Sequence, residues 1–292
     1  MADRRGPLQV FDPDPQQIND QLQRIRDELD ELHEGSSSEG PVLRGYLAGF
    51  GLANGSDATN DITIAAGEAA SDDSDPDDRV LLVGAAMTKQ LDAVWAAGSG
   101  QGGRHPSEGI ADDTWHVFAF RRSGGDDDYF FSRTLTPTPP DGGTTKRRLG
   151  SIVRASSAIR AFVQDGDLFQ WLVPILDVDA TNPGTDAVTA TLSIPTDVRH
   201  RAVLNVYVIA NVSNALLYVS DLSATDSAPS ATAAPLANTT TVLGANNGTE
   251  AGMIEVMTNT SAQVRYRLGA SVASTVVRMA TRGWFDRRGR DD

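Results

Sequence analysis

Residues 263–268 read QVRYRL, a stretch in which polar and apolar side chains alternate without interruption. Successive side chains of an extended strand point to opposite faces of a sheet, so Val264, Tyr266 and Leu268 would share one face. A helix would instead need apolar residues three and four positions apart. The hexapeptide therefore predicts a β-strand with one buried face.

Short apolar runs recur along the chain from residue 42 onward. Gly, Pro and Asp residues flank most of them, and their length suits strands better than helices. Residues 88–97 differ, because Leu91, Val94 and Trp95 fall at helical spacing and predict a short helix. The further predicted strands are Arg44–Leu52, Asp61–Ala65, Val80–Val83, Trp115–Arg121, Tyr129–Phe131, Ile152–Arg154, Ile159–Val163, Leu168–Leu172, Val203–Ile209, Ala215–Val219, Ile254–Thr258 and Val276–Thr281.

The composition changes near Pro174. Charged residues become fewer after about Asp177, and Ala, Thr, Ser, Val and Asn dominate from there. We therefore expect two β-rich domains, residues 42–174 and 175–292. Several short strands at this spacing are typical of antiparallel β-sandwich or jelly-roll-like domains. The predicted fold class is mainly β, with a short N-terminal coiled-coil helix followed by these two domains.

The coiled-coil prediction rests on residues 18–34. Ile18, Leu22, Ile25, Leu29 and Leu32 are spaced four, three, four and three residues apart, with charged and amide residues between them. This is a heptad seam, and leucine at a with isoleucine at d favours three or four strands over two. The alternative is an amphipathic helix docked on the chain's own core, but such a helix usually has a wider apolar stripe.

Two other N-terminal segments flank the heptads. Residues 1–17 contain Pro7, Pro13 and Pro15 and are expected to form an extended arm, while 35–41 form a Gly- and Ser-rich linker. The seam covers fewer than three heptads, which is too short to hold copies together alone. We therefore expect the downstream part of the chain to associate as well.

Composition excludes several classes of protein. Asp and Glu outnumber Lys and Arg by 39 to 25, giving a formal charge of −14, so binding to nucleic acid or to an anionic membrane surface is not expected. There are no cysteines, which excludes disulfides, zinc–thiolate sites and thiol catalysis. The first residues lack an apolar signal-peptide core, and no run approaches the roughly 18 apolar residues of a membrane span. We expect synthesis in a cytoplasm without ordinary secretion.

Catalytic and cofactor motifs are weak. Gly98–Gly103 satisfies G-x-G-x-x-G, but it follows a predicted helix and precedes Arg104-His105-Pro106, so a flexible glycine loop is the better interpretation. No serine nucleophile elbow and no metal-binding histidine pair occurs. We predict no catalytic residue, no metal and no cofactor, although carboxylate pairs that form only in space stay open. The four histidines, interpreted as surface or packing residues, are His33, His105, His116 and His200.

Two acidic runs and three tryptophans are further candidates for binding residues. Asp72–Asp78 and Asp126–Asp128 lack the ligand spacing of a calcium loop and are predicted to be a solvated loop and an acidic turn. Trp115, Trp171 and Trp284 are possible glycan-contacting residues, because an aromatic face packs on a sugar ring. Core packing is the other interpretation, and the commoner one for tryptophan.

The order of several segments between residues 42 and 172 resembles a known family. These segments are 46–52 (YLAGFGL), 60–69 (NDITIAAGEA), 91–96 (LDAVWA), 114–118 (TWHVF), 147–152 (RRLGSI) and 162–169 (FVQDGDLF). In this order they resemble a tail-fibre or minor tail protein of tailed bacteriophages, that is, a virion structural protein. The ending Gly283–Asp286 is similar to endings of phage virion proteins.

The resemblance implies a homotrimeric virion component assembled in the host cytoplasm. Residues 1–17 would dock on other virion proteins, 18–34 would trimerise, and the distal β-domain would contact a host-surface glycan. An architectural head fibre, decoration protein or adaptor without receptor binding is the alternative. A polysaccharide depolymerase is a third possibility, which predicts carboxylates clustered in a groove.

Overall fold

The computed structural model describes residues 16, 21–26, 42–213, 215–229, 240–244 and 248–290. The chain divides into two units, Met1–Val42 and Leu43–Asp292. In the first unit residues 21–26 are helical, and the side chains of Leu22 and Ile25 are 53% and 52% exposed. No long N-terminal helix is shown among the described residues. Most of the predicted arm, the linker and the heptad positions Ile18, Leu29 and Leu32 lie outside them, so the coiled coil stays a prediction.

The regular elements described in the second unit are strands, which confirms the mainly β prediction. No helix in the described part of the chain is long and apolar enough to cross a bilayer. The strands are β1 (Leu47–Gly49), β2 (Leu52–Asn54), β3 (Asp61–Ile64), β4 (Gly67–Ala70), β5 (Leu81–Gly84), β6 (Met87–Val94), β7 (Gln101–Arg104), β8 (Thr114–Arg121), β9 (Asp127–Ser132), β10 (Thr145–Ala155), β11 (Ala158–Ile159), β12 (Phe162–Asp165), β13 (Leu168–Thr181), β14 (Val188–Thr191), β15 (Arg201–Ala210), β16 (Ala215–Ser220), β17 (Thr240–Gly244), β18 (Gly248–Met257), β19 (Gln263–Leu268) and β20 (Val276–Phe285).

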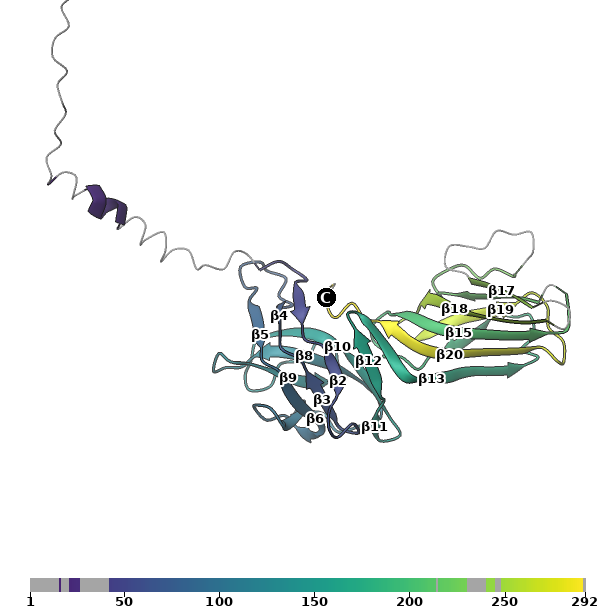
Figure 1. The fold of residues 1–292 in the computed structure, drawn as a ribbon, viewed down its shortest axis with the longest axis horizontal. Helices are drawn as coiled ribbons and strands as arrows, with labels where there is room; N and C mark the ends of the chain where they lie inside the picture. Colours follow the sequence, from purple (N-terminus) through teal and green to yellow (C-terminus); the bar gives the residue numbers. More distant parts are fainter. Residues whose placement is uncertain are drawn as a thin grey trace, which may run out of the picture. The chain divides into compact units, whose positions relative to one another are not determined.

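These strands form four sheets (Figure 1). The strand orders are β1-β4-β5, β11-β10-β8-β9-β7-β6-β3-β2, β12-β13-β20-β15-β18 and β14-β19-β16-β17. The QVRYRL stretch is β19, which pairs antiparallel with β14 and β16. Val264, Tyr266 and Leu268 are buried while the residues between them are less so, as the alternation predicts.

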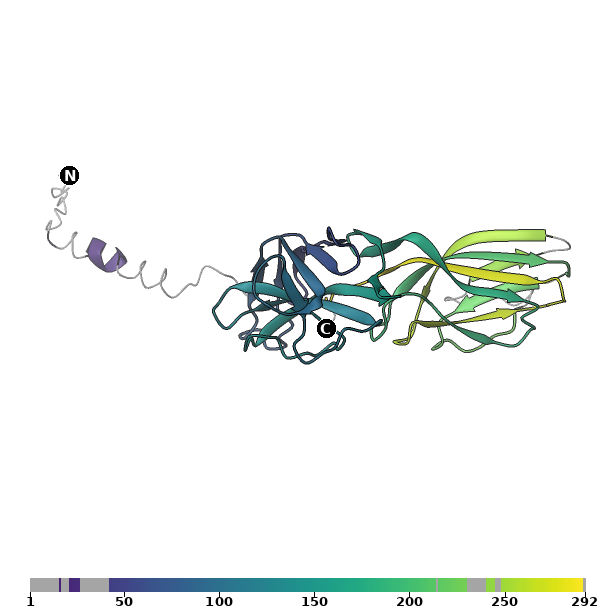
Figure 2. The same ribbon diagram turned by 90° about the horizontal axis from the view of Figure 1, so that it is seen from below.

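One hydrophobic cluster runs through the second unit. It contains Leu52, Leu149 and Phe169 from the first half and Leu204 and Trp284 from the second. The boundary expected between residues 174 and 175 falls inside β13, a strand of 14 residues that pairs with both β12 and β20. A paired strand rather than a linker therefore joins the two halves, and Figure 2 shows the C-terminal strand β20, in yellow, running among strands of the second half.

The helix predicted for residues 88–97 is wrong. The segment forms β6, which pairs antiparallel with β3 and parallel with β7. The prediction of a flexible glycine loop at Gly98–Gly103 is also wrong for its second half, because Gly102 and Gly103 lie in β7. A Cβ at Gly102 would stand 2.0 Å from the Val94 carbonyl oxygen, so the missing side chain is what lets these two strands pack closely.

The acidic turn predicted at residues 126–128 is wrong for two of its three residues. Asp127 and Asp128 belong to β9. Asp128 is buried, and its carboxylate lies 2.9 Å from the Nζ of the fully buried Lys89. The chain buries this carboxylate because a cation is present to compensate it.

Candidate functional site

A polar cleft of about 590 Å³ lies in the second unit. Three stretches far apart in sequence form it: the loop between β7 and β8, the segment after β9, and the segment before β15. Loops on a sheet scaffold commonly carry binding residues. The cleft, called the junction cleft below, is lined by His105, Ser107, Glu108, Asp113, Arg133, Thr134, Pro137, Thr138, Thr196 and Asp197.

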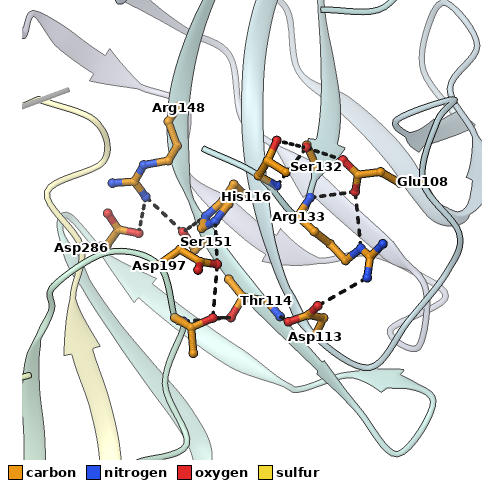
Figure 3. A network of polar contacts seen from close by, with 12 residues as sticks. Glu108, Asp113, Thr114, His116, Ser132, Arg133, Arg148, Ser151, Asp197 and Asp286 are labelled. Carbon is orange, nitrogen blue, oxygen red and sulfur yellow. Dashed lines mark hydrogen bonds and ion pairs between the residues drawn. The ribbon is translucent and has the colours of Figure 1, made fainter. Parts of the chain in front are cut away.

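Arg133 is the central cation of the junction cleft (Figure 3). Its Nε lies 3.6 Å from Glu108 Oε2 and its Nη1 lies 3.5 Å from Asp113 Oδ2. The guanidinium also sits over the Trp115 ring, 5.6 Å from the ring centre. Glu108 is itself fixed, because Ser132 Oγ donates to Oε1 at 2.6 Å and the Arg133 amide donates to Oε2 at 2.8 Å. The charged groups are thus held in place before any ligand arrives.

His105 ties two of the cleft's loops together. Its Nε2 lies 2.8 Å from the Thr138 carbonyl oxygen and its Nδ1 lies 2.8 Å from Ser107 Oγ. A carbonyl oxygen only accepts, so Nε2 carries the proton and Nδ1 accepts from Ser107. The imidazole therefore serves as a clamp between the loops.

Asp197 forms the opposite wall. Its backbone is in the left-handed region at φ 71°, and the preceding Thr196 amide donates to Thr114 Oγ1 at 2.9 Å. The carboxylate is half exposed and lies 3.6 Å from Nε2 of the fully buried His116. The strained turn holds this carboxylate between the cleft and the interior.

His116 lies between Asp197 in the cleft wall and the buried Ser151. Its Nδ1 lies 2.9 Å from Ser151 Oγ, which gives a Ser151–His116–Asp197 series like that of serine hydrolases. Ser151 is fully buried, however, and its Oγ already accepts a hydrogen bond from Arg148 Nη1 at 3.0 Å. A substrate carbonyl has no path to this oxygen. The series is best understood as a structural connection within the core.

Behind the serine lies a buried ion pair between the halves of the unit. Arg148 Nη1 is 2.9 Å from Asp286 Oδ2, and both side chains are buried. Burial would raise the pKa of Asp286, but the charge of Arg148 and its hydrogen bond outweigh it and lower that pKa. Burial and then the Arg148 charge lower the pKa of His116 to about 3, and burial also lowers the pKa of His200. Both histidines are therefore neutral at pH 7.

The residues that follow β20 extend this connection. The Arg288 guanidinium donates to the carbonyl oxygens of Leu149, Gly49 and Phe50 at 2.8, 3.0 and 2.5 Å. Its amide donates to Asp286 Oδ1 at 2.7 Å. The C-terminal segment is thereby fastened to β1, to the β1–β2 turn and to β10.

The three tryptophans predicted as possible glycan contacts are buried. Trp115 and Trp284 have no exposed surface, and Trp171 is 6% exposed. The indole nitrogens of Trp115 and Trp171 donate to the carbonyl oxygens of Ala111 and Ser193. No face of these rings is free to stack on a sugar, so the alternative of core packing describes them.

The sequence did not mark the cleft residues themselves. Glu108, Asp113, Arg133 and Asp197 come from separate segments, and only the fold brings them together. Within the described residues no group of three or more His, Cys, Asp and Glu side chains is arranged to hold a metal ion. The cleft instead presents fixed donors and acceptors, which suit a neutral, polar ligand rich in hydroxyl groups.

No protein-family model matches the chain. No curated protein matches it at a significant level either.

Proposed function

We propose that this chain is a structural protein of a bacteriophage virion, a homotrimeric tail-fibre or tail-tip component that contacts the host surface. The resemblance of residues 42–172 to phage tail proteins and the heptad pattern of residues 18–34 support it. The unit Leu43–Asp292, made of sheets and bearing a preformed polar cleft, suits an extracellular binding part. Residues 1–17 would attach it to other virion proteins.

The finer architecture is part of this proposal. The five-stranded sheet with β13, β20 and β15 and the four-stranded sheet with β16 and β19 contribute buried residues to one cluster. Two antiparallel sheets that share a core suit a β-sandwich. We therefore assign the C-terminal half to a sandwich-like fold.

The junction cleft is the observation that favours contact with a host glycan. Carboxylate oxygens of Glu108 and Asp113 can accept from sugar hydroxyls, and Arg133 can donate to sugar oxygens. Because the Arg133 pairs are already in place, little side-chain entropy would be lost on binding. Threonine hydroxyls around them add further donors and acceptors.

The test is binding of the full chain to an array of bacterial surface polysaccharides. We expect Arg133→Ala to weaken binding about tenfold or more, since it removes one charge-assisted contact of roughly 1.5–3 kcal/mol. Arg122→Ala is the matched control: Arg122 is also paired with a carboxylate, Asp141, at 3.0 Å and lies over a tryptophan ring, Trp95, but it is outside the cleft. Equal effects of the two variants would contradict the cleft assignment.

Two other functions would give different results. No binding to any surface polysaccharide, with the chain still found in assembled particles, would favour an architectural fibre, decoration protein or adaptor. The depolymerase alternative is favoured by the carboxylates of Glu108, Asp113 and Asp197 in one cleft. It predicts that reducing ends accumulate during incubation and that Glu108→Gln abolishes this. Glu108 and Asp113 are both tied to Arg133, so we expect binding without cleavage.

A further inference from the structure

The outer face of the sheet β12-β13-β20-β15-β18 exposes large apolar side chains. Val173 is 75% exposed, Leu172 62%, Met253 60% and Leu176 52%. Val163 on the neighbouring β12 is also exposed. Isolated exposed apolar residues are ordinary, but a contiguous group on a soluble protein marks an interaction site.

The strand register places two of these residues, Leu176 and Met253, on the same face of the sheet. Leu176 pairs with Ala280, Ala280 with Asn205, and Asn205 with Met253. Residues paired in this way across a sheet point to the same side. Leu176 and Met253 therefore belong to one row that crosses the sheet from β13 to β18 (Figure 1).

An irregularity in β13 interrupts the ladder beside this face. The pairing with β20 shifts register between Gln170 and Ile175, so the residues between them leave the regular ladder. The Leu172 amide still bonds the Ala161 carbonyl oxygen at 3.1 Å, which holds the segment in place. The exposed side chains of Leu172 and Val173 lie in this irregular segment and are called the knob below.

A groove lies beside the knob. It has a volume of about 550 Å³ and is lined by Leu176, Asn205, Val206, Tyr207, Ala251, Gly252, Arg278 and Ala280. A second hollow, of about 460 Å³, surrounds the knob and shares Leu176 with the groove.

Charged pairs of both signs border the apolar area. Arg278 Nε lies 2.8 Å from Asp179 Oδ1, and Arg201 Nε lies 3.2 Å from Glu255 Oε2. An apolar centre with a polar rim is the usual composition of a protein interface. Because the rim carries both signs, two copies of this face would not repel each other, even though the whole chain has a charge of −14.

We propose that this face is where copies of the chain associate, with the Leu172–Val173 knob of one copy in the groove of the next. The proposal rests on the proposed homotrimer and names its contact surface. A second copy is the occupant because the chain has a heptad segment too short to hold copies together alone. Knob and groove are different patches, so the knob of one copy can enter the groove of the next, and such a head-to-tail contact forms a trimer when its rotation closes into a ring.

The first test is the solution mass of the full chain over a range of concentrations. We expect Val173→Lys to weaken association at least about tenfold, because it would bury an unpaired charge at each contact. Val83→Lys is the matched control, since Val83 is 60% exposed on β5, outside this sheet. Leu172→Ser, which adds no charge, should weaken association in the same direction. A melting curve for each variant checks that it is folded.

The second test uses the absence of cysteine from the chain. The double variant Val173→Cys with Ala251→Cys should form disulfides between copies under mild oxidation, giving cross-linked dimers and trimers on a non-reducing gel. Val83→Cys with Ala251→Cys should give none. Absence of cross-links in the first variant overturns the knob-in-groove contact.

The outcomes separate this proposal from the one on which it rests. A wild-type chain that is monomeric at every concentration overturns both the homotrimer and its surface. A wild-type multimer with the same dissociation in Val173→Lys, Leu172→Ser and Val83→Lys overturns only the surface.

Discussion

At the scale of single residues, the buried histidines are the groups whose protonation bears on stability. His116 and His200 are buried among Arg148, Asp286 and the end of β20. Burial lowers the pKa of both, and the pKa of His116 falls from 6.5 to about 3. In the unfolded chain these residues regain ordinary pKa values near 6.5. The folded state therefore binds fewer protons than the unfolded state in mildly acidic solution.

From this difference we expect stability to fall as the pH decreases below about 6.5. The contribution of the neutral histidines is fully present above pH 6.5 and is lost progressively toward pH 3 for His116. Each histidine contributes up to about 1.4 kcal/mol per pH unit in this window. Urea unfolding at intervals between pH 7.5 and 4.5 measures how the unfolding free energy depends on pH. His116→Asn should reduce the slope of this dependence by the amount that corresponds to one proton. A flat profile would contradict the assignment.

At the scale of the elements, the interior of β6 explains why its sequence resembled a helix. Lys89 and Leu91 are both buried, so the strand does alternate with a period of two. This alternation is not recognisable in the sequence, because one of the buried positions is a lysine and lysine is almost always exposed. Its ammonium is accommodated by Asp128 and by the carbonyl oxygens of Ala96 and Gly98, at 2.7 and 3.1 Å. Contacts with distant residues therefore determine that this segment is a strand and not a helix.

The close approach of β6 and β7 gives a second prediction. Gly102→Ala would place a methyl group against the Val94 carbonyl, so we expect a loss of about 1–3 kcal/mol in unfolding free energy. Gly109→Ala is the control, because a Cβ there meets nothing within 4 Å. Thermal or urea unfolding of both variants measures the difference. Equal stability of the two would show that β7 can shift away from β6 without loss.

At the scale of the whole second unit, the two halves are held by buried polar contacts as well as by a shared core. Arg148 on β10 pairs with Asp286 just after β20, and Arg288 donates to the carbonyl oxygens of Gly49 and Phe50 near the start of the unit. The hydrophobic cluster continues from one half to the other. The halves are therefore expected to unfold together in one transition.

Removing one partner of the buried pair should weaken this coupling. Asp286→Ala leaves the Arg148 charge buried without its carboxylate, and we expect a loss of about 3–5 kcal/mol. Arg290→Ala is the matched control from the same segment: its pair with Asp167 is partly exposed and is worth about 0–1 kcal/mol. Calorimetry measures both. Similar small losses, or two transitions in the wild type, would contradict the coupling.

Most strands could be predicted from local pattern, but several could not. β4, β14 and β17 are short and rich in Gly, Ala and Thr, so they lack an apolar run. The strand β19 was predictable because its alternation is local and one face is buried. The candidate site was not, because Glu108, Arg133 and Asp197 have no shared motif and meet only through loops that the sheets position.

By itself the sequence determined the mainly β class, the positions of β19 and other strands with a local apolar pattern, and the absence of thiol chemistry. These properties follow from side-chain alternation and composition, which act over a few residues. Only the tertiary structure decided the strand β6, the burial of the tryptophans, the junction cleft and the apolar face of the five-stranded sheet. Each depends on which distant segments become neighbours. Burial and electrostatic compensation are properties of that neighbourhood rather than of the local sequence.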